Sequence, residues 1–147
     1  RNTLKKSWGM RFINVNGRLQ KKSVSKYLID WDKKSRSKIQ FKVKKFLEPF
    51  WKAHIVFEEF PVYGSRLKVD ILNATNKVAI EVQGGQHNAF NKFFHGDSRL
   101  KYLESIKRDI KKAEWLETNK FKLIEINENE VDKLSKSFFR KQFGLYL

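Results

Sequence analysis

Three short strand-like segments follow one another in the middle of the chain, and this run constrains the fold more than any other feature of the sequence. The first segment is rich in β-branched and aromatic residues, the second alternates apolar and polar residues, and the third is almost wholly apolar. The segments are residues 54–62, 66–72 and 77–82, separated by the turn residues Gly64-Ser65 and Asn73-Ala-Thr-Asn76. Short turns of this composition join neighbouring strands, so the pattern predicts adjacent strands of one sheet.

Amphipathic helical patterns flank the strands on both sides. Apolar residues recur at helical spacing over residues 37–51 and again over residues 98–116. Pro49 predicts that the first helix stops or distorts near that position. A further strand over residues 121–126 and a last helix over residues 129–142 complete the order α-β-β-β-α-β-α, which indicates an α/β fold.

The first 36 residues precede this core and differ from it in composition. Residues 10–15 alternate apolar and polar side chains, and Asn16-Gly17 offers a two-residue turn, which predicts a small basic β-hairpin. An irregular linker follows, and its most polar stretch, residues 33–38, marks a boundary. The sequence therefore predicts a hairpin and linker extension over residues 1–36 and a second domain over residues 37–147.

The excess positive charge is concentrated in the first third of the chain. The whole chain has 32 Lys and Arg against 16 Asp and Glu, and residues 1–52 alone hold 16 of the bases against three acids. Aromatic residues are interleaved with these bases, which suits phosphate neutralisation beside stacking, although a Lys-rich segment can also be plain solvated surface. Nucleic acid is the favoured partner, and an anionic membrane surface is a weaker alternative.

The composition excludes several classes of protein. The chain has no cysteine, which excludes a disulfide scaffold, a Cys-ligated zinc finger and thiol catalysis. No apolar run approaches the ~18 residues of a membrane span, and no signal-peptide pattern opens the chain. With 40% hydrophobic residues, the chain is too apolar for a disordered basic tail. We therefore expect a globular protein of the intracellular, cytoplasmic type that does not span a membrane.

Two acidic residues are set among buried-type residues on adjacent predicted strands. Asp70 interrupts the second strand and Glu81 the third. An ionised carboxylate in such a place costs several kcal/mol unless a cation or hydrogen-bond donors compensate it. Two carboxylates that share a small space repel each other, and a divalent cation of the magnesium type relieves that repulsion. The alternative is that Asp70 pairs with Lys68 or a helix base while Glu81 faces solvent.

The residues after Glu81 add further polar groups. Gln83 lies two positions on, so it projects to the same side of the strand as Glu81. Gly84-Gly85 lets the backbone turn sharply, and His87 follows. A single histidine in a loop is usually an ordinary surface residue. Here His87 follows an Asp/Glu/Gln cluster in a basic protein, and this combination favours a catalytic role.

The ordered set of residues resembles the PD-(D/E)XK nuclease core, with Asp70 followed by Glu81-x-Gln83. The chain reads IEVQGGQH over residues 80–87, and RDIKK follows at 108–112 and FKLI at 121–124. This set is closer to the very-short-patch-repair endonucleases and the related phage homing endonucleases described by an E-D-x-H-D active site. The similarity covers roughly residues 37–127. It implies a restriction-endonuclease-like core with a mixed sheet flanked by helices. The N-terminal hairpin extension and the C-terminal helix lie outside the resemblance.

The resemblance also implies roles for individual residues. Asp70 would bind Mg²⁺ (or Mn²⁺), with Glu81 and the carbonyl of Val82 completing the metal site. His87 would activate water or protonate the leaving oxygen, and Asp109 would orient His87. The alternative for Asp109 is an ordinary helical partner of Lys112, three residues later.

The chain departs from the family pattern at two positions. Gln40 stands where a glutamate is expected on the first helix, and Gln83 stands where the motif has lysine. Glu48 lies about two turns too late to replace that glutamate, and Glu58-Glu59 on the first strand are less naturally placed. An introduced Glu→Gln change at position 40 and natural divergence are both open explanations.

The resemblance implies a site-specific DNA endonuclease of the homing type. Double-stranded DNA would be the partner, and a homodimer is expected because one small chain cuts one strand. The residues expected to contact DNA lie in the basic segment: Arg11, Arg18, Gln20, Lys21, Lys22, Lys26, Lys33, Lys34, Arg36 and Lys38. The alternatives are a mismatch-directed nicking endonuclease and a non-catalytic DNA- or RNA-binding module on a decayed nuclease fold.

Overall fold

The protein adopts a mixed α/β fold with two sheets, as the sequence predicts. The computed structural model describes residues 8–84 and 98–147. The elements are β1 (Gly9–Ile13), β2 (Leu19–Ser23), η2 (Ser25–Tyr27), α1 (Lys38–Trp51), β3 (Val56–Pro61), β4 (Lys68–Asn73), β5 (Val78–Gln83), α3 (Ser98–Thr118), β6 (Lys122–Asn127), η3 (Glu128–Lys133) and α4 (Lys136–Phe143). None of the described helices combines the length and apolar character that crossing a membrane requires.

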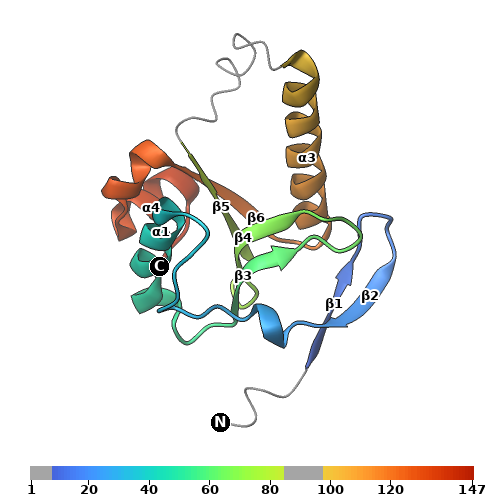
Figure 1. Ribbon diagram of the computed structural model, residues 1–147. Helices are drawn as coiled ribbons and strands as arrows, with labels where there is room; N and C mark the ends of the chain where they lie inside the picture. Colours follow the sequence, from blue (N-terminus) through green and yellow to red (C-terminus); the bar gives the residue numbers. More distant parts are fainter. Residues whose placement is uncertain (1–7, 85–97) are drawn as a thin grey trace.

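The larger sheet has four strands in the order β3-β4-β5-β6. The first three strands are successive and antiparallel, because short turns join them. Strand β6 instead runs parallel to β5, after the chain has passed along α3 (Figure 1). Parallel neighbours need such a crossover, so α3 is tied to the edge of the sheet where β5 and β6 pair.

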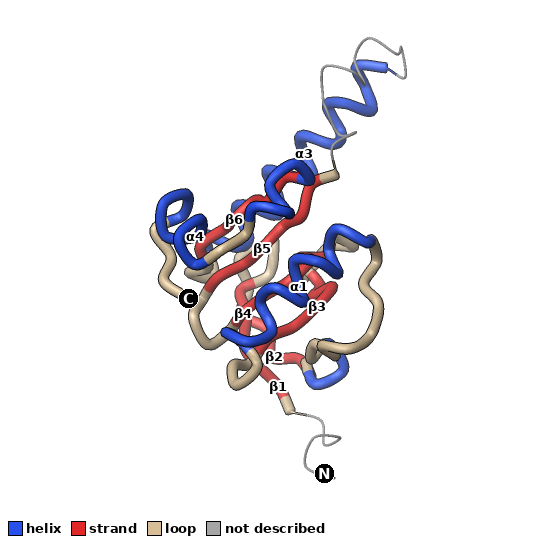
Figure 2. The backbone as a smooth tube through the Cα atoms, turned by 90° about the vertical axis from the view of Figure 1, so that its left-hand side faces the viewer, coloured by secondary structure: helices blue, strands red, loops and turns tan. Residues whose placement is uncertain are grey.

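Two apolar clusters lie on the two faces of this sheet. Helices α1 and α4 pack on one face, where the buried residues include Leu47, Trp51, Ile80 and Phe139. The last turns of α3 and the β1–β2 hairpin pack on the other face (Figures 1 and 2). Many side chains of each cluster are fully buried, which shows that both faces of the sheet are covered by other elements.

The N-terminal hairpin is anchored by an aromatic side chain. Phe12 is 2% exposed, and its ring centroid lies 5.2 Å from that of Phe60 and 5.5 Å from that of Trp115. Asn119 at the end of α3 bonds the hairpin backbone, accepting from the Ile13 N–H at 2.8 Å and donating to the Ile13 carbonyl at 3.0 Å. One hydrophobic cluster therefore spans the boundary that the sequence suggested at residue 36.

The predicted two-residue turn of the hairpin is wrong, because β1 and β2 are joined by five residues, 14–18. The Asn14 side chain organises this connection, since its Oδ1 accepts from the N–H groups of Asn16 at 2.8 Å and Arg18 at 3.0 Å. Gly17 has φ +84°, a backbone conformation that glycine adopts without strain. The Val15 N–H donates to the Tyr63 carbonyl at 2.9 Å, so the longer turn is docked on the end of the large sheet.

Two helix predictions also need correction. Helix α1 continues past Pro49 to Trp51, because the proline lies only two residues from the helix end and Trp51 is buried. The single helix predicted over residues 129–142 is instead a 3-10 helix followed by α4. Ser135 separates them, because its side chain accepts from the Phe138 N–H and starts a new helix.

Candidate functional site

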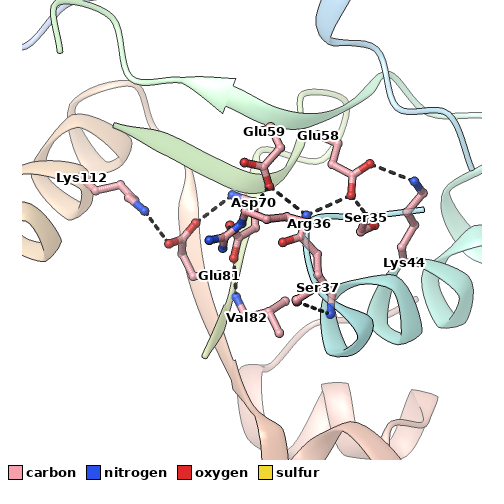
Figure 3. Close-up of polar contacts among 11 residues, drawn as sticks. Ser35, Arg36, Ser37, Lys44, Glu58, Glu59, Asp70, Glu81, Val82 and Lys112 are labelled. Atoms are coloured by element: carbon pink, nitrogen blue, oxygen red, sulfur yellow. Dashed lines mark hydrogen bonds and ion pairs between the residues drawn. The ribbon is translucent and has the colours of Figure 1, made fainter. Parts of the chain in front are cut away.

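Strands β4 and β5 stop pairing through their backbones at the point where the two predicted acids lie. Their last paired residues are Ile71 and Ile80. Beyond this pair the Asp70 N–H donates to Glu81 Oε2 at 2.9 Å, and the Val82 N–H donates to Asp70 Oδ2 at 2.8 Å (Figure 3). Each carboxylate thus replaces a backbone acceptor of the neighbouring strand. The exchange brings Asp70 and Glu81 together, as the sequence predicts, and satisfies part of their need for donors in the interior.

The neighbouring strand β3 is distorted at the same level. Glu59 lies opposite Asp70, between paired residues on either side, and has φ +53°. Phe57 and Phe60 both pack into the same cluster although they are three residues apart. In a regular strand, residues three apart point to opposite faces of the sheet, so the strand is irregular between them. A positive φ on a residue with a Cβ costs about 1–2 kcal/mol. Backbone strain of this kind gathers at functional sites, and here it directs Glu59 toward the acids.

An arginine from the loop before α1 connects two of these acids. Arg36 Nη2 lies 3.2 Å from Asp70 Oδ1, and its Nε lies 3.6 Å from Glu59 Oε2. Burial and the nearby charge of Glu81 raise the pKa of Asp70 to about 7. The Val82 N–H and the Arg36 guanidinium both act to lower it. A cation beside Asp70 therefore stabilises its charged form.

Gln40 on α1 faces two further carboxylates. Ser37 caps the helix by accepting from the Gln40 N–H at 3.2 Å, which fixes the first turn. The Gln40 Nε2 donates to Glu58 Oε2 at 2.9 Å and to Glu59 Oε2 at 3.0 Å. Its Oε1 is buried and has no hydrogen-bond partner among the residues that the structure describes. A glutamate at position 40 would face these two acids with no proton to donate, so the amide suits the surroundings that this chain provides.

A buried lysine balances part of this negative charge. The Lys44 side chain is completely buried, and its Nζ lies 2.9 Å from Glu58 Oε1 and 2.7 Å from the Lys33 carbonyl. The Ser35 hydroxyl donates to Glu58 Oε2 at 2.6 Å. Glu58 is therefore held in place by α1 and by the preceding loop.

Glu81 is paired with a base from the crossover helix. Lys112 Nζ lies 2.6 Å from Glu81 Oε1, and Glu81 is only 7% exposed. The alternative in which Glu81 faces solvent is therefore wrong. Asp109 is exposed on the same helix, and the ion pair of Lys112 goes to Glu81 rather than to Asp109. A sequence signal for the orientation of Lys112 does exist, because it lies one helical turn before the buried Trp115 and so points toward the sheet.

The structure brings together only part of the predicted set. Asp70, Glu81, Val82 and Gln40 belong to one connected polar cluster. Gln83 is half-buried at the end of β5, and His87 lies outside the described residues. Most of the residues expected to contact DNA are exposed: Arg11, Arg18, Lys21, Lys22, Lys26, Lys33, Lys34, Arg36 and Lys38. Gln20 is half-buried, and its Oε1 lacks a hydrogen-bond partner within the described ranges.

The cluster consists of the hard oxygen donors that Mg²⁺ and Mn²⁺ prefer. Within residues 8–84 and 98–147, no group of three or more His, Cys, Asp or Glu side chains is placed to hold a metal ion. A magnesium site needs fewer, because the ion keeps several waters and uses one or two carboxylates. Asp70 and Glu81 are two such carboxylates, and their four oxygens contact Arg36, Lys112 and the N–H groups of Asp70 and Val82. The unpartnered Oε1 of Gln40 is a neutral oxygen in the same cluster.

The fold and the site define an α/β protein with a cluster of carboxylates and bases, several of them buried, where two strands of its sheet separate. No family model matches the chain, and no solved structure matches it either. It is 32% identical over 85 residues to the "Uncharacterized protein 033L" of Invertebrate iridescent virus 3. The matched stretch covers 54% of this chain and 44% of the viral protein, so the chain corresponds to less than half of that relative.

Proposed function

We propose that the protein is a metal-dependent DNA endonuclease of the type represented by the very-short-patch-repair and E-D-x-H-D homing endonucleases. The observation that supports this proposal best is the meeting of Asp70 and Glu81 where β4 and β5 separate. Burial of an ionised carboxylate carries a desolvation cost, and two acids without a chemical role would avoid that cost on the surface. Burial of both acids, beside the strained residue Glu59 of the neighbouring strand β3, therefore favours a catalytic role.

Asp70 and Glu81 would hold the divalent cation, with the Val82 carbonyl and Gln40 Oε1 as neutral oxygens of the same region. A bound Mg²⁺ or Mn²⁺ neutralises negative charge at a phosphodiester and lowers the pKa of water. Free histidine titrates close to neutral pH, so His87 would be the group that takes or gives a proton. The exposed bases of the hairpin and linker would neutralise the phosphates that flank the cut.

A plasmid assay tests the proposal directly. Supercoiled plasmid is incubated with the full chain in Mg²⁺ and, separately, in EDTA. We expect nicked or linear product only in Mg²⁺, and we expect Asp70→Asn to remove it while DNA binding persists. Asp132→Asn, at an exposed acid, is the matched control and should cut normally. Cutting that is equal in EDTA, or unchanged in Asp70→Asn, would reject the proposal.

The same assay separates the two catalytic alternatives. Nicked circles that accumulate without linear product indicate a nicking enzyme, whereas linear product indicates cuts on both strands. A homodimer is expected in the second case, because each copy cuts one strand. Light scattering on the protein with and without a DNA duplex measures this stoichiometry.

A second candidate function is a DNA- or RNA-binding module without catalysis. It is favoured by the bases that already neutralise the acids, since Arg36 pairs with both Asp70 and Glu59. Lys44 likewise pairs with Glu58, and Lys112 with Glu81. For this candidate, tight DNA binding would accompany the absence of any cleavage in Mg²⁺ or Mn²⁺. Gln40→Glu then distinguishes an activity that has decayed from one never present, because it restores the acid that the family carries at that position.

A further inference from the structure

We propose that Lys112 is a catalytic residue of this nuclease, whose ammonium group contacts the phosphate being cut. The inference rests on the proposed function and deepens it, because it assigns the positive charge of the site to the crossover helix α3. Strand β5 does not bring such a charge, since Gln83 is neutral. The sequence indicates only that Lys112 points toward the sheet, whereas its contact with Glu81 comes from the structure.

The first argument is placement. Lys112 Nζ donates to Glu81 Oε1 at 2.6 Å, while Glu81 Oε2 accepts from the backbone N–H of Asp70 at 2.9 Å (Figure 3). One glutamate thus links the ammonium group to the strand that carries Asp70. Lys112 reaches the split in the sheet from the side opposite to Arg36 and α1, so the two ends of the acidic cluster meet different bases.

The second argument is the partial burial of the lysine. Its side chain is 16% exposed, whereas its neighbour Lys111 is exposed on the surface of the same helix. An ammonium group has three N–H donors, and within the described part of the chain the hydrogen bond of Lys112 goes to Glu81. Donors therefore remain for a ligand with several acceptor oxygens. A phosphodiester provides such oxygens and carries the opposite charge.

The third argument is chemical. In hydrolysis, the oxygen of water bonds to phosphorus and the bond from phosphorus to the leaving oxygen breaks. The attacking water gives up a proton, and the leaving oxygen gains one. Negative charge on the non-bridging oxygens grows or is redistributed along the way, and a fixed cation in a partly dehydrated site stabilises it. Lys112 in its charged form gives and takes no proton in this step.

A purely structural role for Lys112 makes a different prediction, because a lysine that only neutralises Glu81 acts on folding. The test therefore measures single-turnover cleavage in Mg²⁺, DNA affinity and thermal unfolding for the same set of full-length variants. The variants are Lys112→Met, Lys112→Gln, Lys112→Ala and the surface control Lys111→Met. Lys112→Gln keeps a donor for Glu81 but removes the charge, so it reports on catalysis even if Lys112→Met fails to fold.

We expect Lys112→Gln to slow the cleavage step by about 100-fold or more, in the range seen when one charge-stabilising donor is removed. Its DNA affinity should change by less than about threefold, and it should be fully folded at the assay temperature even though loss of the Lys112–Glu81 pair lowers its unfolding temperature. Lys111→Met should cut at the wild-type rate. Added ethylammonium should partly restore cutting by Lys112→Ala, because it supplies the missing charge without a link to the chain.

The outcomes separate this inference from the proposed function. Wild-type protein that never cuts overturns both of them. Wild-type protein that cuts, together with a Lys112→Gln variant that cuts equally fast, overturns the role of Lys112 alone. A slower Lys112→Gln variant whose deficit follows only its lower stability or weaker DNA affinity also overturns it.

Discussion

Arg36 and Asp70 are 34 residues apart in the chain, and the guanidinium Nη2 lies 3.2 Å from the Asp70 Oδ1. The arginine side chain is 64% exposed while the aspartate is almost fully buried. The exposed side chain of Arg36 thus lies against the buried carboxylate of Asp70, which belongs to the proposed cation site. A divalent cation at Asp70 would share the carboxylate with this guanidinium, which contacts Oδ1, and with the Val82 N–H, which contacts Oδ2.

This relationship predicts the titration of Asp70 in the metal-free protein. Arg36→Ala should raise the pKa of Asp70 further above about 7, because the guanidinium acts to lower it. The ¹³C chemical shift of the side-chain carboxyl, followed as a function of pH, measures the change. Arg66→Ala removes an exposed arginine from the turn before β4 and serves as the control. An Asp70 titration that is the same in all three proteins would contradict the role assigned to Arg36.

The raised pKa of Asp70 also predicts how stability depends on pH. Between the ordinary value of 3.8 and about 7, the folded protein keeps a proton on Asp70 that the unfolded chain releases. The contribution of Asp70 is therefore fully present below pH 3.8 and is lost as the pH rises through 7. The loss of this contribution lowers the free energy of unfolding by up to ~1.4 kcal/mol for each unit of pH increase in that window.

Asp70→Asn should remove this component. Urea denaturation in EDTA at several pH values compares the variant with the wild type and with the exposed-site control Asp132→Asn. The difference in unfolding free energy between Asp70→Asn and the wild type should change steadily across the window between the two pKa values. A difference that is independent of pH would show that Asp70 titrates normally.

The buried pair of Lys44 and Glu58 predicts a large stability effect. Lys44→Met leaves Glu58 without its cation, and breaking a buried pair in this way costs about 3–5 kcal/mol. The double variant Lys44→Met/Glu58→Gln should recover part of that stability, since no charge is then left unpaired. Lys42→Met breaks a pair that is exposed on both sides and should cost less than about 1 kcal/mol. Equal costs for the two lysines, measured by urea denaturation, would be inconsistent with the arrangement.

The anchoring of the hairpin predicts a similar contrast between two apolar residues. Phe12→Ala removes a ring from an aromatic cluster and should cost about 3–5 kcal/mol of unfolding free energy. Leu19, which is 65% exposed on the same hairpin, should tolerate alanine within about 0.5 kcal/mol. The fluorescence of Trp115, which stacks on Phe12, reports whether the hairpin has left the core. A small destabilisation by Phe12→Ala would mean that the hairpin contributes little to the folded state.

The exposed bases of the hairpin predict the salt dependence of DNA binding. Replacing Lys21 and Lys22 with alanine should weaken binding and reduce the slope of log K against log salt by about 0.9 for each phosphate that is no longer neutralised. Arg140→Ala and Lys141→Ala remove bases from α4, on the other side of the molecule, and are the matched control (Figure 1). Fluorescence anisotropy at several salt concentrations measures the slopes. Equal salt slopes for the hairpin double variant and the α4 double variant would show that the hairpin lysines do not contact DNA phosphates.

The order of elements and the meeting of Asp70 with Glu81 could be predicted from the sequence, because both depend on local signals. Strand and helix periods are short-range, and a short turn fixes which strands are neighbours. The positive φ of Glu59 and the contact of Arg36 with Asp70 could not be predicted, since they depend on residues distant in the chain. Position 40 illustrates the difference, because its departure from the pattern of the nucleases that the sequence resembles was visible, whereas its two carboxylate neighbours were not.

The hairpin turn failed as a prediction for a related reason. Asn16-Gly17 favours a tight two-residue loop when the hairpin is considered alone. In the structure the Asn14 side chain and the docking of Val15 on Tyr63 outweigh that preference and lengthen the connection. Tertiary contacts thus decide a turn that local chemistry leaves open.

If the protein binds DNA as proposed, the position of Phe12 restricts how its target could change. Because its ring fills space between Phe60 and Trp115, the N-terminal arm and the rest of the fold must be inherited together, and exchanging the arm between relatives would leave a hole in the interior. New specificity would instead arise by point substitutions among the exposed lysines of β2 and the segment after it, whose replacement leaves the interior untouched.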